Sequence, residues 1–126
     1  MINTVITGSG HFLPERIVKN SDFLNYKFYD EQGVFIEKPV SEIIQKFQEI
    51  TEIEERRYAE DNMFTSDLAV IAAERAIADA GIDKEEIDYV IVANNYGDID
   101  PVHRQVDNMP SLATRVKNKL GIKNNR

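Results

Sequence analysis

Two adjacent arginines, Arg56 and Arg57, are the residues in this sequence best suited to binding an anion. A guanidinium group presents several N–H donors in one plane, which matches the geometry of a carboxylate or a phosphate. The same pair follows several acidic residues, and exposed ion pairs of that kind stabilise a protein only weakly. We therefore favour a solvated segment with local ion pairs, and we keep a weak anionic cofactor site at these two arginines as the alternative.

Metal and thiol chemistry finds no support in the composition. The chain has no cysteine, which excludes a disulfide, a zinc thiolate site and a cysteine nucleophile within these residues. Its two histidines, His11 and His103, are far apart in segments that contain glycine and proline. A metal site needs several ligands that converge, so we expect no bound metal.

Gly8 and Gly10 raise the question of a dinucleotide site, because glycine-rich turns after a strand can bind a pyrophosphate. The pattern requires a third glycine where Leu13 stands and a helix directly afterwards, yet Pro14 resists helix formation. The sequence thus argues against nucleotide binding. We expect instead that the two glycines allow a tight exit from a first strand over Asn3–Thr7.

The composition is that of a small acidic domain. The 126 residues carry a net charge of −7, which argues against attraction to nucleic acid or to an anionic membrane. No apolar run is long enough to span a bilayer, and the start does not read as a signal peptide. We expect a cytoplasmic protein with one partial domain over residues 1–126 and an irregular insertion at about residues 26–40.

The segment that organises the rest runs from Thr65 to Asn95. Thr65–Gly81 has helical spacing, and a glycine at its end commonly ends a helix in the left-handed conformation. A row of alanines on one side would let a neighbouring backbone approach closely: Ala69, Ala72, Ala73, Ala76 and Ala80. Asp83 and Glu86 are suited to cap a short helical turn. The apolar run Tyr89–Ala93 then favours a strand covered on both faces, as in a parallel sheet.

Two further helices are expected. Ser41 is suited to begin one with an apolar face at Ile43, Ile44, Phe47 and Ile50. Pro110 is suited to begin the other, which has an apolar face at Leu112, Ala113, Val116 and Leu120 and a closing Gly121. Between them, Tyr96–Met109 reads as a long polar loop. The fold class is α/β with an incomplete sheet, which indicates part of a domain or a chain completed by another.

The order of these segments resembles the N-terminal part of β-ketoacyl-acyl-carrier-protein synthase III, a family of the thiolase-like superfamily. The matching pieces are Ile6–Gly10 with Leu13–Glu15, Thr51–Arg57, Thr65–Gly81, Ile87–Ala93, and Met109–Ser111 leading to Leu120–Lys123. The resemblance implies the N-terminal part of a five-layered αβαβα fold, a homodimer, and no other cofactor than a CoA thioester substrate. A close thiolase-like relative, such as a chain-extending or ketide synthase, shares this first half.

By this resemblance the full enzyme is an acyltransferase of fatty acid biosynthesis, which condenses an acyl thioester with malonyl on acyl carrier protein. Its cysteine, histidine and asparagine are expected beyond Lys123 and in a second half. Since a cysteine nucleophile forms the acyl-enzyme, we expect no catalytic residue and no condensing activity in these 126 residues alone. The alternative is a non-enzymatic α/β binding or dimerisation module.

The resemblance also assigns weaker roles to several residues. Met109 matches a loop residue that reaches across the dimer into the partner's acyl pocket, although an ordinary loop methionine explains it equally well. Basic residues near the end could dock an acidic carrier protein: Arg115, Lys117, Lys119, Lys123 and Arg126. The chain has no tryptophan, and Lys46, Phe47, Ile50 and Glu52 stand where the family holds the adenine end of CoA. These departures argue against CoA binding in the usual manner, and a different carrier-bound acyl donor is compatible with them.

Overall fold

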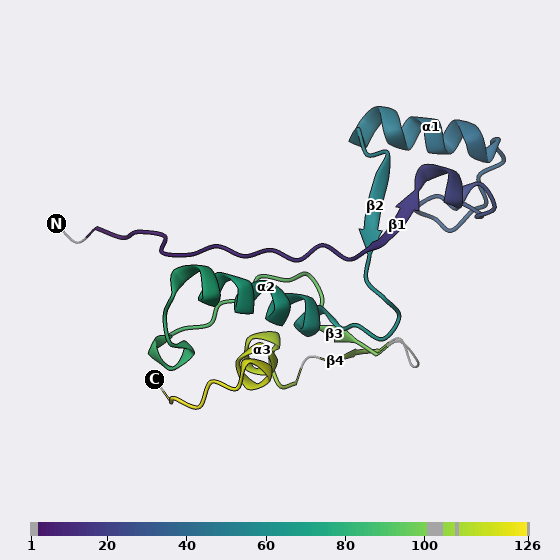
Figure 1. Ribbon diagram of the computed structural model, residues 1–126. Helices are drawn as coiled ribbons and strands as arrows, with labels where there is room; N and C mark the ends of the chain where they lie inside the picture. The colour runs from purple at the N-terminus through teal and green to yellow at the C-terminus, as the bar shows by residue number, and fades with distance from the viewer. Residues whose placement is uncertain (1–2, 101–104, 108, 126) are drawn as a thin grey trace. The chain divides into compact units, whose positions relative to one another are not determined.

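The computed structural model describes residues 3–100, 105–107 and 109–125, and it divides into two compact units (Figure 1). The ribbon unit comprises residues 14–59, and the helical unit comprises the described residues of 1–13 and 60–126. Neither unit contains a described helix that is long and apolar enough to cross a membrane. Each unit has its own secondary structure and its own buried residues, as follows.

The ribbon unit is built on a two-stranded antiparallel sheet. Strands β1 (Arg16–Lys19) and β2 (Glu55–Tyr58) pair with Arg16 opposite Tyr58, and the 3₁₀ helix η1 (Asn20–Phe23) follows β1 directly. Helix α1 (Val40–Thr51) buries Ile43 and Ile44 of its predicted apolar face, whereas Phe47 and Ile50 of that face are 45% and 70% exposed. Within the irregular stretch, a single antiparallel bridge joins Tyr29 to Phe35 and closes a small turn.

The expected start of α1 at Ser41 is wrong. The helix already begins at Val40, and Pro39 rather than a serine occupies the N-cap position without a side-chain hydrogen bond. The proline ring holds φ at −53°, close to the helical value, so the chain enters the helix directly after it.

The helical unit is organised by two packed helices, α2 (Thr65–Ala80) and α3 (Leu112–Leu120). Each ends at a left-handed glycine, Gly81 with φ of 64° and Gly121 with φ of 68°, as predicted. A short 3₁₀ helix, η2 (Lys84–Glu86), carries the expected Asp83 and Glu86 capping box. The core consists of Val116, Leu120 and Ile122, surrounded by the partly buried Ala69, Val70, Ala73, Ile77, Ile87, Val90 and Val92.

The predicted long polar loop contains a small hairpin. Strands β3 (Asp98–Ile99) and β4 (Val106–Asp107) pair antiparallel, with Asp98 opposite Asp107. Residues 101–104, which include His103, lie outside the described residues. Two-residue strands with aspartate in both give almost no strand signal in a sequence, which is why the hairpin was not expected.

The N-terminal segment corrects one prediction and confirms another. Asn3–Thr7 is extended, but it pairs with no strand in the part of the chain that the structure describes. Gly8 and Gly10 do not form a strand exit, because they lie against the backbone of α2. A Cβ atom on Gly10 would stand 2.3 Å from the Ala72 carbonyl oxygen, and one on Gly8 2.6 Å from the Ala76 carbonyl oxygen. The predicted close approach of a backbone to the alanine row is therefore confirmed.

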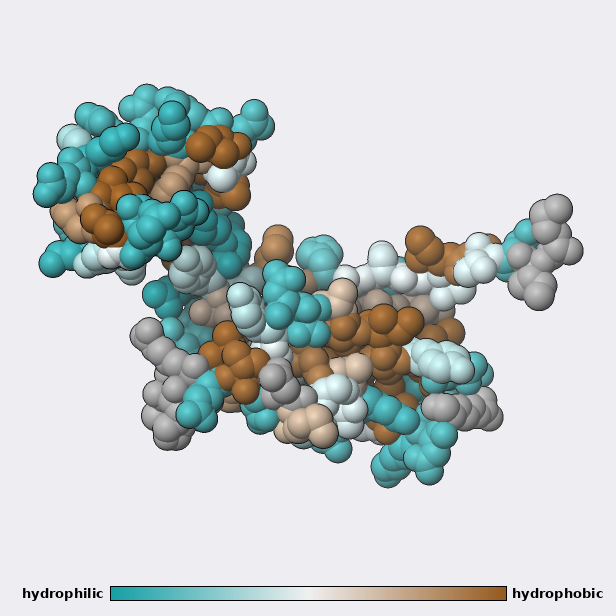
Figure 2. Space-filling model, turned by 180° about the vertical axis from the view of Figure 1, so that it is seen from behind, coloured by the Kyte–Doolittle hydropathy of each residue, from teal (hydrophilic) through white to brown (hydrophobic). Residues whose placement is uncertain are grey.

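The run Tyr89–Ala93 also differs from the expectation of a strand covered on both faces. Val90 and Val92 contact the core, whereas Tyr89 and Ile91 are 84% and 91% exposed. The segment forms no ladder with any described strand, so only one of its faces is covered. Hydrophobic side chains are correspondingly visible on the surface of the molecule (Figure 2).

These elements make a small α/β structure with two separate antiparallel pairs of strands. The α/β class is confirmed at this level. That residues 1–126 form one partial domain remains a prediction.

Candidate functional site

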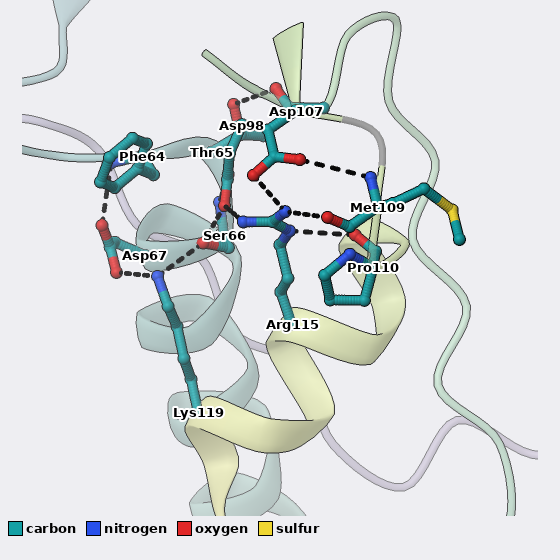
Figure 3. A network of polar contacts seen from close by, with 11 residues as sticks. Phe64, Thr65, Ser66, Asp67, Asp98, Asp107, Met109, Pro110, Arg115 and Lys119 are labelled. Atoms are coloured by element: carbon teal, nitrogen blue, oxygen red, sulfur yellow. Dashed lines mark hydrogen bonds and ion pairs between the residues drawn. The ribbon is translucent and has the colours of Figure 1, made fainter. Parts of the chain in front are cut away.

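A group of interacting polar side chains lies where the start of α2, the β3–β4 hairpin and helix α3 meet (Figure 3). We call it the polar cluster and define it by Ser66, Asp67, Asp98, Asp107, Arg115 and Lys119. The first two residues come from α2, the next two from the hairpin strands and the last two from α3. Because Arg115 and Lys119 are four residues apart in a helix, their side chains lie on the same face.

Asp98 is the buried centre of the polar cluster, with only 3% of its surface exposed. Its carboxylate accepts hydrogen bonds from both the backbone N–H and the hydroxyl of Ser66, each at 2.8 Å. A buried carboxylate is costly unless it is hydrogen-bonded or paired with a cation. Ser66 is itself fully buried, so this pair fixes the first strand of the hairpin to the first turn of α2.

Arg115 connects the hairpin to the start of α3. One terminal guanidinium nitrogen, Nη1, lies 3.6 Å from the Asp98 carboxylate, and the other, Nη2, lies 2.6 Å from that of Asp107. Nη2 also donates to the Met109 carbonyl oxygen at 2.9 Å, and Nε donates to the Pro110 carbonyl oxygen at 3.0 Å. The planar guanidinium thus reaches four acceptors at once, which a lysine ammonium cannot do in this geometry.

Lys119 holds the other side of the cluster. Its ammonium donates to the Ser66 hydroxyl at 2.6 Å and pairs with Asp67 at 2.5 Å, and it lies over the Phe64 ring. The hydrogen bond from Lys119 is the largest cause that holds the pKa of Asp67 below its ordinary value. Asp67 also accepts from the Phe64 backbone N–H, so it caps α2 from inside the first turn.

Asp107 is the exposed carboxylate of the cluster. The hydrogen bond from Arg115 is the largest cause that lowers its pKa. Its other oxygen accepts a long hydrogen bond, 3.4 Å, from the Met109 backbone N–H. Asp107 is therefore ionised at neutral pH and bound to the same turn that Arg115 contacts.

An open pocket of about 670 Å³ borders the polar cluster. Its lining includes the aromatic ring of Phe64, three carboxylates and two cations; the lining residues are Phe64, Asp98, Asp100, Asp107, Pro110, Thr114, Arg115, Asn118 and Lys119. Several of these charged groups already pair with one another. The pocket does not offer a set of free metal ligands, and among the described residues no group of three histidine or acidic side chains is placed to hold a metal ion.

The two arginines singled out from the sequence lie in the ribbon unit. Arg56 donates to the Asn20 side chain at 2.9 Å and lies over the Phe23 ring, 5.3 Å from its centroid. Arg57 donates to the Glu15 carbonyl oxygen at 3.4 Å and lies 3.9 Å from the Glu55 carboxylate. Both guanidinium groups thus have partners within the unit, and anion binding by them remains a prediction.

Three of the basic residues proposed to dock a carrier protein have partners within the chain. Arg115 and Lys119 belong to the polar cluster, and the Lys117 ammonium donates to the Asn124 carbonyl oxygen. Arg126 lies outside the described residues. Side chains held in this way present less free charge than the sequence suggests, and carrier docking stays a prediction.

Sequence reasoning missed Ser66, Asp98 and Asp107 as members of a site. Asp98 and Ser66 are 32 residues apart, and no local pattern joins a serine inside a helix to an aspartate in a polar loop. The available signal was weaker: Asp98 and Asp107 both precede Arg115 in a polar segment of the sequence.

The α/β fold and the polar cluster do not by themselves indicate one activity, because many unrelated functions share such α/β units. No model of a known protein family matches the chain. Among curated proteins, it is 40% identical over 124 residues to β-ketoacyl-[acyl-carrier-protein] synthase III of Ehrlichia canis (strain Jake). It is 35% identical over 123 residues to the enzyme of that name from Paracoccus denitrificans, and 37% over 120 residues to that from Staphylococcus aureus (strain JH1).

These alignments include 95–98% of this chain and 32% of each relative. The chain therefore spans about a third of the length of the curated relatives that it matches. The similarity to the N-terminal part of β-ketoacyl-[acyl-carrier-protein] synthase III, predicted from the sequence, is confirmed. The three relatives above are named as synthases, which does not favour the alternative of a non-enzymatic binding module.

Proposed function

We propose that this chain supplies the N-terminal part of a condensing enzyme of the β-ketoacyl-acyl-carrier-protein synthase III type. The supporting observation is the similarity of nearly the whole chain to synthases of that name. In this reaction an acyl group leaves its donor thioester and forms a thioester with an enzyme cysteine. The malonyl unit on acyl carrier protein then loses CO2, and the resulting carbanion takes the acyl group and frees the cysteine. The proposal includes a thiolase-like fold, a homodimer and a cytoplasmic location for the full enzyme.

The chain contributes structure to this reaction, not the nucleophile. It contains no cysteine, so the acyl-enzyme thioester cannot form on these residues. What it provides is the pair of packed helices, the hairpin and the turn at Met109. With 81% of its surface exposed, Met109 is free to contact the acyl chain held by a second copy, the role that its sequence position suggests.

The acyl donor differs from the usual one in this proposal. Arg56 and Arg57 have partners inside the ribbon unit, and the chain has no tryptophan to stack on an adenine ring. A donor carried on acyl carrier protein would not need those contacts. We expect the enzyme to use an acyl-carrier-protein donor in preference to acyl-CoA.

The test compares the 126-residue chain with the longer product read from the same gene. Each is supplied with malonyl-acyl-carrier-protein and with an acyl donor on either CoA or carrier protein, and β-ketoacyl product is measured. We expect no product from the chain alone and product from the longer protein. Condensation by the chain alone would contradict the proposal. So would a stop codon directly after Arg126 with no second polypeptide that restores activity.

A further inference from the structure

The chain leaves helix α3 through the residues Leu120–Asn124, which we call the exit segment. Gly121 ends the helix within it in the left-handed conformation. The Leu120 carbonyl oxygen accepts from the Lys84 ammonium at 2.8 Å, and the Asn124 carbonyl oxygen accepts from the Lys117 ammonium. The last carbonyl groups of a helix have no partner within the helix. Lysine side chains therefore hold both ends of the exit segment.

Glu85 of η2 holds the backbone of the exit segment between these ends. Its carboxylate accepts from the Lys123 backbone N–H at 2.9 Å and from the Asn124 backbone N–H at 2.8 Å. Successive N–H groups that converge in this way bind anionic oxygens. A carboxylate suits them because both of its oxygens accept, whereas a carboxamide has only one acceptor oxygen. The contact is therefore specific to an acidic side chain at position 85.

The Asn124 side chain completes the contact in the opposite direction. Its amide nitrogen donates to the Glu85 carbonyl oxygen at 2.7 Å and to the Ile87 carbonyl oxygen at 3.0 Å. Ile87 itself packs against the core of the helical unit. The exit segment is thus bound to two backbone positions of another part of the chain, and these reciprocal contacts fix its direction as well as its place.

We infer that Glu85 is a positioning residue, which sets the place and the direction in which the chain leaves the helical unit. The inference rests on the proposed function, in which the nucleophile belongs to the longer enzyme. Because the present residues include no cysteine, the exit segment is the covalent connection between the helical unit and that nucleophile. A displacement of about 1 Å at a reacting group lowers a rate by up to about a hundredfold, so the hold on this connection affects catalysis.

Glu86 provides a matched control in the same turn. Its carboxylate accepts from the Asp83 backbone N–H at 3.4 Å, as part of the capping box of η2. Glu86→Gln removes the same charge from the same turn as Glu85→Gln, but it leaves the contacts between Glu85 and the exit segment in place. A difference between the two variants therefore reports on those contacts and not on the charge.

The first test is amide hydrogen exchange in the 126-residue chain. We expect Glu85→Gln to speed exchange at Lys123 and Asn124 about tenfold, because a charge-assisted hydrogen bond is lost. Glu86→Gln should leave these rates unchanged. Exchange at Val116, in the core, reports on opening of the whole unit and should be the same in both variants. Unchanged exchange at Lys123 in Glu85→Gln would overturn the inference.

A second variant covers the case in which Glu85→Gln also speeds exchange at Val116 and so destabilises the whole unit. Asn124→Ala keeps the Glu85 carboxylate and removes the two hydrogen bonds from the Asn124 side chain. We expect it to speed exchange at Lys123 about threefold while exchange at Val116 stays the same. Equal rates at Lys123 with and without this change would contradict the inference.

The second test uses the longer enzyme read from the same gene. We expect Glu85→Gln to lower kcat for β-ketoacyl product about tenfold and to leave KM for the acyl donor unchanged, as when a reacting group is displaced and the donor site is not. Glu86→Gln should leave both constants unchanged. Because kcat is calculated per folded molecule from the circular dichroism signal, a loss of stability alone does not change it. An unchanged kcat in Glu85→Gln would overturn the positioning role.

The two proposals fail in different ways. If the unmodified longer enzyme makes no β-ketoacyl product, the proposed function is wrong. Hydrogen exchange in the 126-residue chain then still decides whether Glu85 holds the exit segment. If the unmodified enzyme is active and Glu85→Gln behaves as Glu86→Gln does in both tests, the proposed function stands and the inference is wrong.

Discussion

Helix α3 and the run Tyr89–Ala93 belong to the same helical unit and pack on the same core, yet they are stabilised very differently. The helix buries Leu112, Val116 and Leu120. The run buries neither Tyr89 nor Ile91, although Val90 and Val92 touch the same core. The apolar face of α3 is buried within the chain, whereas the run has only one of its two faces covered.

The difference follows from where each element finds its hydrogen bonds. A helix satisfies its backbone groups within itself, so α3 needs only an apolar surface such as α2 to pack on. A strand needs a neighbouring strand for its N–H and C=O groups. No described strand pairs with Tyr89–Ala93, so its outward face keeps the exposure that its composition would not predict. Within the helical unit, α3 therefore needs no further chain to satisfy its backbone hydrogen bonds, whereas the run Tyr89–Ala93 lacks a strand partner.

The largest predicted effect separates these two elements directly. Leu120→Ala removes a buried side chain from the core, and we expect a loss of about 3 kcal/mol in the free energy of unfolding of the 126-residue chain. Ile91→Ala truncates a side chain that is 91% exposed, and it should cost less than about 0.5 kcal/mol. Urea denaturation followed by circular dichroism measures both.

An Ile91→Ala cost close to that of Leu120→Ala would break the comparison. It would mean that the outward face of the run is covered in the isolated chain, for instance by self-association. Repeating the measurement over a tenfold range of protein concentration tests that explanation, because association makes stability depend on concentration.

A smaller effect is expected where an extended segment is held by a helix. Gly10→Ala would place a Cβ atom 2.3 Å from the Ala72 carbonyl oxygen and 2.4 Å from the Ala76 backbone nitrogen. Because these are backbone atoms of α2, the segment must move away, at a cost of about 2 kcal/mol. Ser9→Ala is the matched control. It keeps the backbone N–H that donates to Asp79 and should be nearly neutral, and equal effects of the two variants would show that the close approach is unimportant.

The polar cluster sharpens the comparison, since it holds an extended hairpin by side chains rather than by a sheet. Ser66→Ala removes a fully buried hydroxyl that donates to Asp98 and accepts from Lys119. We expect a loss of about 1.5 kcal/mol in unfolding free energy, since a buried partner loses its hydrogen bond. Thr65→Ala next to it removes a hydroxyl whose hydrogen bond to the Gly97 carbonyl oxygen is 3.5 Å long, and it should cost much less. Similar losses in the two variants would contradict the central place of Ser66.

The smallest effect concerns acid. The pKa of Asp67 is lower in the folded chain than in an unfolded one, chiefly because Lys119 donates to it. The stability from this pair is therefore present above the ordinary carboxyl pKa of about 3.9 and is lost as the pH falls through the lower folded value. In Lys119→Met, the urea midpoint should fall less between pH 5 and pH 2 than in the unmodified chain. An equal fall in both proteins would show that Asp67 does not contribute to this acid sensitivity.

The sequence was sufficient for features determined within a few residues. The glycines that end α2 and α3, the apolar face of α3 and the Asp83 capping box all follow from local chemistry. The alanine row even predicted the close approach of a backbone, although not that residues 8–10 would provide it. The pairing of β1 with β2 was not predicted, because strand partners 36 or more residues apart leave no local signal.

The candidate site was much harder to predict. Arg115 and Lys119 were recognised as cations, but their counter-ions were not, and the cluster depends on those counter-ions. Asp98 is an ordinary loop aspartate in the sequence, and only folding places it beside Ser66 in a buried position. Resemblance to a family supplied the proposed role of Met109, but it gave no indication of the contacts that hold the Met109 turn.

The contact of the N-terminal segment with α2 has a consequence for how the protein is made. Ser9 is bound to Asp79, which the ribosome adds 70 residues later. At roughly 5–20 residues per second, the segment waits about 4–14 s before its helix exists. During that interval Gly8 and Gly10 lack the backbone of α2, against which they lie in the folded chain. The beginning of the chain is thus the part that is synthesised first and packed late.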